Sequence, residues 1–142
     1  MNRRFLRTAA ALAGLAALMI AGHAGAADFV IIVNKENSNP VDADYVGRAF
    51  RGDVKTWPSG EAISALALPE ANPLRVAFDK EILGKAPNQT KAMWSALVFT
   101  GKAAPPKVVD SEANVVKTVA ENKNAIGYVS AGAAGSSVKV VK

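Results

Sequence analysis

The sequence has no cysteine and only one histidine, His23, among its 142 residues. His23 lies in the N-terminal segment that we expect to be removed on export, so the exported chain has neither residue type. It therefore has no thiolate nucleophile, no Ser-His-Asp triad and no ordinary zinc ligand set. The carboxylates are scattered along the chain, and no two of them stand out as an acid/base couple. The residue types therefore exclude most hydrolase chemistry, and we do not expect an enzyme.

The sequence also lacks the common ligand-binding motifs. No run alternates Asp and Asn ligands with a distal Glu, as a calcium loop does. The phrase FTGK at 99–102 has one glycine and closes a helix, whereas a P-loop opens one. We therefore expect no cofactor. Aromatic residues make up only 6% of the chain and are too spread to form a stacking stripe for nucleic acid.

The positive charge of the chain is concentrated at its N-terminus. The formal net charge is +5, with 17 basic and 12 acidic residues. Arg3, Arg4 and Arg7 supply three of the basic side chains, so the remainder has a net charge of about +2. Lysines and acids alternate along this remainder and form no basic block. The charge pattern does not indicate a nucleic-acid partner.

Residues 1–26 have the order of a secretory signal peptide: arginines, an apolar run, then small residues. The apolar run is short for a bilayer, which usually requires about 20 apolar residues, so a retained membrane anchor is the less favoured alternative. We expect cleavage after Ala26 and a single exported domain over 27–142. The paired Arg3 and Arg4 leave ordinary and twin-arginine export open, and ordinary secretion is favoured.

Apolar runs and helical periodicity alternate along the exported domain. The patterns predict strands at 29–33, 61–68, 125–129 and 138–142, and helices at 42–50, 73–83, 87–99 and 110–122. Pro105 and Pro106 cannot continue a helix, so 104–107 is predicted to be an extended linker. The small residues of 130–137 predict a loop. Strands that alternate with helices predict an α/β fold around one mixed sheet.

The first candidate ligand site is the helix start in LPEANPLRVAF, where Asn72 precedes Pro73 and Arg75 follows. Free N–H groups and the helix dipole attract anions to such a position, and Arg75 adds a positive charge. Against this, Pro73 has no N–H, the Asn72 side chain can cap the helix itself, and Asp79 lies one turn after Arg75. We favour a capped structural helix and keep an anion contact as the alternative.

The second candidate is the end of the next helix, where Thr100 and Lys102 flank Gly101. A hydroxyl and an ammonium on one turn are suited to holding an anion. A helix C-terminal cap is the favoured interpretation, because glycine is common there and lysine suits the negative helix end.

The order of these motifs resembles a known family. The segment VIIVNKENSNPVDADYVGRAFRGDVKTWPSG is similar to the opening of one lobe of the periplasmic phosphate-binding proteins of ABC transporters. Phe50, Gly52, Trp57 and Gly60 match the phrase F-x-G-x-x-x-x-W-x-x-G. NAIGYV at 124–129 resembles the near-terminal strand of that family, and WSALVFTGKAAPPKVV resembles its short members.

The resemblance implies a single-lobe member of this type 2 periplasmic-binding-protein-like family, located in the periplasm. Full-length members hold phosphate between two lobes, partly through a Ser-Gly-Thr-type phrase at a helix start. Here that place reads LPEANPLR, with Asn72 as the polar residue and Arg75 inside the helix.

From the resemblance and the residues we expect a solute-binding-like protein for phosphate or another small anion. Its candidate ligand residues are Asn72, Arg75, Thr100 and Lys102. The alternative is a periplasmic accessory module that binds no ligand and contacts a membrane transporter or sensor protein. A homodimer through the open face of the lobe is a further expectation.

Overall fold

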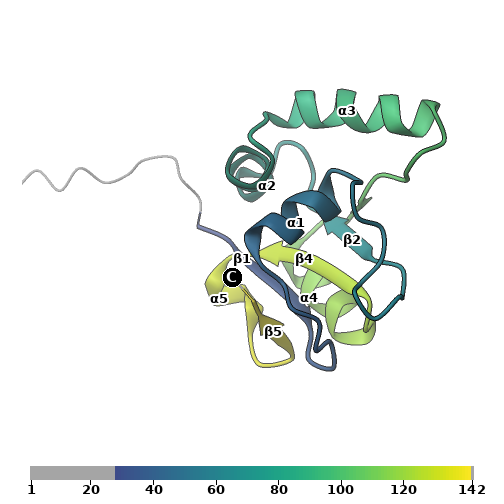
Figure 1. Cartoon of the computed structure of the whole chain (residues 1–142). Coiled ribbons are helices and arrows are strands. Elements are labelled where there is room, and N and C mark those ends of the chain that lie inside the picture. The colour runs from purple at the N-terminus through teal and green to yellow at the C-terminus, as the bar shows by residue number, and fades with distance from the viewer. Residues whose placement is uncertain (1–27, 142) are drawn as a thin grey trace, which may run out of the picture.

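The computed structural model describes residues 28–141 (Figure 1). The predicted cleavage site after Ala26 lies outside these residues. The strands form one five-stranded mixed sheet in the order β3-β2-β4-β1-β5. Their bounds are β1 (Val30–Asn34), β2 (Ser64–Ala67), β3 (Lys107–Val108), β4 (Ala125–Val129) and β5 (Val138–Val140). β1 is antiparallel to β4 and β5, while β2 is parallel to β4 and β3.

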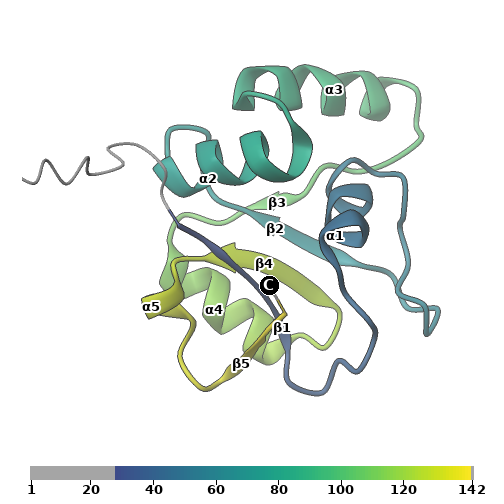
Figure 2. The same cartoon turned by 60° about the vertical axis from the view of Figure 1, so that its left-hand side comes forward.

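The helices cover both faces of this sheet, as the two views together show (Figures 1 and 2). Their bounds are α1 (Ala43–Phe50), α2 (Pro73–Phe78), the π-helical turn η1 (Asp79–Leu83), α3 (Pro87–Phe99), α4 (Glu112–Glu121) and α5 (Ala131–Ala134). α4 packs against β4 and β1 on one face, and α1, α2 and η1 lie on the other with α3 outside them. The predicted α/β fold with a mixed sheet is confirmed.

The centre of the fold is β4, in which every residue is buried. On the α1 and α2 face, the Tyr128 ring stacks on Phe78 with ring centroids 4.0 Å apart, and Phe50 packs edge-on against Phe78. On the α4 face, Gly127 leaves room for Val115. The apolar run AIGYV is therefore a central strand because helices cover both of its faces.

Several predicted boundaries differ from the structure. Residues 130–137 were predicted to be a loop, but they contain the short helix α5, whose alanines favour a helical turn. The strand predicted at 61–68 is shorter and spans only Ser64–Ala67. The helix predicted at 73–83 changes to a π-helical turn at Asp79 and ends at Gly84, which has φ 65°. Within residues 28–141, no helix is long and apolar enough to span a membrane.

The close approach of Gly127 to α4 predicts a specific sensitivity. A Cβ atom at this position would lie 2.7 Å from Cγ1 of Val115, so Gly127→Ala should lower the free energy of unfolding by about 1–3 kcal/mol. Gly132→Ala in α5 is the matched control, since nothing lies within 4 Å of its added Cβ. Urea denaturation of both variants measures the difference, and equal stabilities would contradict the tight packing of α4 on β4.

Candidate functional site

The helix start at Asn72 is capped by its own side chain. Oδ1 of Asn72 accepts a hydrogen bond from the Leu74 N–H at 2.9 Å, and Pro73 has no N–H to donate. The first helical positions therefore offer few free donors to an anion. The favoured interpretation of a capped structural helix is confirmed for the Asn72 side chain.

Arg75 is buried, with only 8% of its surface exposed. Its Nε donates to Oδ2 of Asp79 at 2.8 Å, and its Nη1 donates to the carbonyl oxygen of Leu68 at 2.8 Å. Burial raises the pKa of Asp79, and the hydrogen bond and charge of Arg75 offset part of that rise. The guanidinium thus joins α2 to η1 and to the chain that leaves β2.

The peptide groups of Leu68 are satisfied by two side chains. Its N–H donates to the hydroxyl oxygen of Tyr128 at 3.0 Å, and its carbonyl accepts from Arg75. Burial raises the pKa of Tyr128 well above its ordinary value, so this hydroxyl stays protonated at neutral pH. Internal groups therefore fill the positions beyond the end of β2, where an α/β fold commonly binds ligands.

A small cavity of about 110 Å³ lies beside Arg75. Arg75 and Lys91 border it, as do the carboxylates of Glu70 and Asp79. The Nζ atom of Lys91 lies 3.7 Å from Oε1 of Glu70, so these two side chains form an ion pair. The charges around the cavity therefore balance, and the field at this position does not strongly favour an anion.

Thr100 and Lys102 form the cap of α3. The Thr100 hydroxyl donates to the carbonyls of Ala96 and Leu97, and the Lys102 N–H donates to the Leu97 carbonyl at 3.0 Å. Gly101 adopts φ 68°, as the favoured C-terminal cap requires.

The structure does not bring the four candidate residues into one site. The Lys91–Glu70 pair places the first turns of α3 beside the loop before Asn72. Thr100 lies nine residues further along the chain, roughly 13 Å from Lys91 at the rise of a helix. The first candidate, at Asn72, and the second candidate, at Thr100, therefore lie on different parts of the surface.

α3 carries an exposed apolar surface that sequence analysis did not identify. Trp94 in the middle of this helix is buried, but the residues one turn later are not. Val98 is 50% exposed and Phe99 is 93% exposed. With Trp94, Ser95 and Pro105 they line an open hollow of about 410 Å³. The apolar phrase LVF directly before the helix cap was the available signal for this surface.

No family model and no curated protein matches the chain. Solved structures do match its fold. An ABC-type phosphate transport receptor from Vibrio cholerae has a TM-score of 0.57 and 19% identity, covering 80% of this chain and 45% of the receptor. A putative phosphate ABC transporter substrate-binding protein with bound phosphate from Clostridium perfringens has a TM-score of 0.64 and 21% identity. This match covers 80% of this chain and 44% of the Clostridium perfringens protein. PstS from Borrelia burgdorferi has a TM-score of 0.60 and 13% identity, and the match covers 80% of this chain and 46% of PstS.

The chain spans less than half the length of each of these proteins. The predicted resemblance to phosphate ABC transporter substrate-binding proteins is therefore confirmed at the level of the fold, and this coverage fits a single lobe. At 13–21% identity these matches concern the fold.

The buried pair of Arg75 and Asp79 predicts a large stability effect. Asp79→Asn leaves the guanidinium buried without a counter-charge and should destabilise the fold by about 3–5 kcal/mol. Asp44→Asn is the matched control, because the Asp44–Arg48 pair has the same i,i+4 spacing but is exposed. Its effect should stay within about 1 kcal/mol. Urea denaturation compares the two variants, and similar losses would show that burial adds nothing to the Arg75 pair.

Proposed function

We propose that the chain is an exported, non-catalytic, single-lobe protein of anion uptake or sensing in the periplasm, and that it acts mainly by contacting another protein. One observation carries this proposal: Arg75, the cation at the expected ligand position, is buried and bonded to Asp79 and to the Leu68 carbonyl. A guanidinium held in this way offers little of its charge to a solute.

The geometry of a single lobe supports the same conclusion. Sites that hold small molecules well bury most of the ligand surface, which usually requires walls on opposite sides. The cavity beside Arg75 is small and bordered by balanced charges. A second chain that covers the lobe would supply the missing wall, whether it is a partner protein or a second copy.

The exposed apolar surface of α3 is the contact surface that we favour. Phe99 is almost fully exposed and Val98 is half exposed. Both line the open hollow together with Trp94 and Pro105. Large apolar side chains grouped beside a hollow are typical of protein contact sites. The solved structures of similar fold come from phosphate ABC transport, so we propose a membrane transporter or sensor protein as the partner kind.

Direct binding of phosphate or another small anion is the second candidate. The Arg75 guanidinium donates its two hydrogen bonds from Nε and Nη1. Its Nη2 group is left to donate to a ligand in the small cavity, which Lys91 also borders. Asn72 at the helix start, and Thr100 with Lys102 on their separate turn, are the other proposed contacts.

We expect weak binding of phosphate by the isolated monomer. One open lobe excludes little water, so the dissociation constant should be on the order of 0.1 mM or weaker, near −5 kcal/mol. Calorimetry with phosphate and sulfate, combined with light scattering, measures affinity and oligomeric state together. Lys91→Gln and Lys102→Gln test the two candidate positions without disturbing the buried pair. A strict monomer with submicromolar affinity would contradict the proposal.

Contact through α3 predicts a position-specific cross-link. A photoreactive phenylalanine analogue at position 99 should cross-link the exported protein to an integral membrane protein in intact cells, since Phe99 is 93% exposed. The same analogue at Lys117, an exposed position of α4 on the other face of the sheet, is the control and should give no such adduct. Equal adducts from both positions, or none from position 99, would exclude α3 as the contact surface.

A further inference from the structure

The charges of the chain are distributed unevenly around α3. Residues 82–109, which contain α3 and the segments before and after it, include four lysines and no carboxylate. All 12 acidic residues of the chain lie outside this range. Figure 2 shows α3 as the outermost helix on its side of the sheet. The segment that carries the α3 contact surface therefore contributes charges of one sign only. Its lysines are Lys85, Lys91, Lys102 and Lys107.

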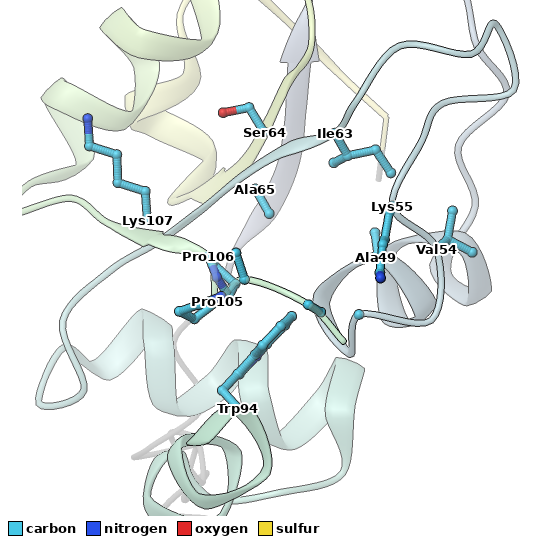
Figure 3. Close-up of a pocket in the computed structure, with 13 residues that line it drawn as sticks. Ala49, Val54, Lys55, Ile63, Ser64, Ala65, Trp94, Pro105, Pro106 and Lys107 are labelled. Carbon is cyan, nitrogen blue, oxygen red and sulfur yellow. The ribbon is translucent and has the colours of Figure 1, made fainter. Parts of the chain in front are cut away.

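Three of these four lysines add little charge beside Phe99. Lys85 precedes α3, whose thirteen residues span about 20 Å, so it lies at the opposite end of the helix. Lys91 is engaged in its ion pair. Lys107 lies in β3, and its side chain points away from α3 (Figure 3). Of the four, Lys102 is the one that supplies positive charge near Phe99.

Folding places a second lysine beside Lys102. The ammonium group of Lys55, in the loop that follows α1, donates a hydrogen bond to the Lys102 carbonyl oxygen. The Lys102 N–H in turn donates to the Leu97 carbonyl at 3.0 Å, which holds this point against the last turn of α3. Phe99 belongs to the same turn and is 93% exposed. Two cations and a large apolar side chain therefore share one end of α3.

The end of the helix accounts for only part of this positive charge. The free carbonyl groups at a helix C-terminus amount to about half a negative charge. Asp53 is close to Lys55 in the chain, but its Oδ2 lies 3.3 Å from Nε of Arg51 and pairs with that residue. In the part of the chain that the structure describes, neither Lys55 nor Lys102 forms an ion pair. An excess of positive charge therefore remains at this end of α3.

We propose that the α3 contact surface binds an acidic protein surface, whose carboxylates pair with Lys55 and Lys102 and whose apolar side chain enters the hollow beside Phe99. The inference rests on the proposed function and names the chemistry of the partner. Complementary charges at the rim of an interface speed association and exclude partners of the same sign. A second copy of this chain is disfavoured, because it would bring the same lysines. The hollow of about 410 Å³ favours a protein over a lipid surface, since a protein presents a fixed side chain that fills it.

Spheroplasts, which expose the periplasmic face of the inner membrane, test the charge of the partner. Purified exported protein with the photoreactive phenylalanine analogue at position 99 is added in phosphate-free buffer, so that phosphate binding plays no part. At low salt it should form an adduct with an integral membrane protein. Raising NaCl from about 20 mM to about 300 mM should lower the adduct yield about tenfold, because salt screens charges at the rim.

Charge reversal at Lys102 tests the same contact without salt. Lys102→Glu should lower the low-salt yield about tenfold, since it replaces an attraction by a repulsion, and Lys55→Glu should act alike. Lys102→Arg keeps the charge and should keep the yield, which separates the effect of charge from that of the altered side chain. Lys117→Glu is the matched control, because it changes the net charge equally at an exposed position of α4 and should leave the yield unchanged.

The outcomes separate this inference from the proposed function. No adduct from position 99 at either salt concentration would overturn the α3 contact and the acidic partner together. An adduct whose yield responds neither to salt nor to Lys102→Glu would overturn the acidic partner alone. Equal losses from Lys102→Glu and Lys117→Glu would do the same. An adduct with lipid or with a second copy of the chain, or equally strong binding to protein-free phosphatidylglycerol vesicles, would also overturn it.

Discussion

The buried guanidinium of Arg75 holds together the part of the fold that faces away from α4. A positive charge inside a protein is tolerated only when counter-charges and hydrogen bonds surround it. Asp79 in η1 and the Leu68 carbonyl meet this need, and the Tyr128 hydroxyl satisfies the Leu68 N–H. α2, η1, β2 and β4 are thereby joined at one point. The same bonds occupy the place where a solute-binding lobe would meet its ligand.

α3 is attached to this body much more loosely. Only Thr90 and Trp94 of its thirteen residues are buried, so most of the helix surface faces solvent. Trp94 serves as its anchor and lines both the cavity beside Arg75 and the hollow next to Phe99. A helix held mainly by one aromatic ring leaves unfilled space around that ring, because few neighbouring side chains reach it. The exposed contact surface follows from this sparse packing.

The candidate site was predictable where its interactions are local. Asn72 before Pro73 indicates a cap, and Arg75 with Asp79 has the spacing of a helical ion pair. Both appear in the structure. Their burial was not predictable, because it depends on Tyr128 and Leu68, which lie 60 residues apart in the chain. The roles of Asn72, Arg75, Thr100 and Lys102 in ligand binding stay predictions.

The sequence by itself determined the residue types and most of the helices and strands. Periodicity, caps and breakers act over three or four residues, so α1, α4 and β4 could be read from their own segments. The absence of cysteine likewise needs no structure to interpret. Only the tertiary structure decided the strand order, the exposure of Phe99 and the contact between Lys55 and Lys102. These features arise where distant segments meet, and the packing between such segments depends on the whole chain at once.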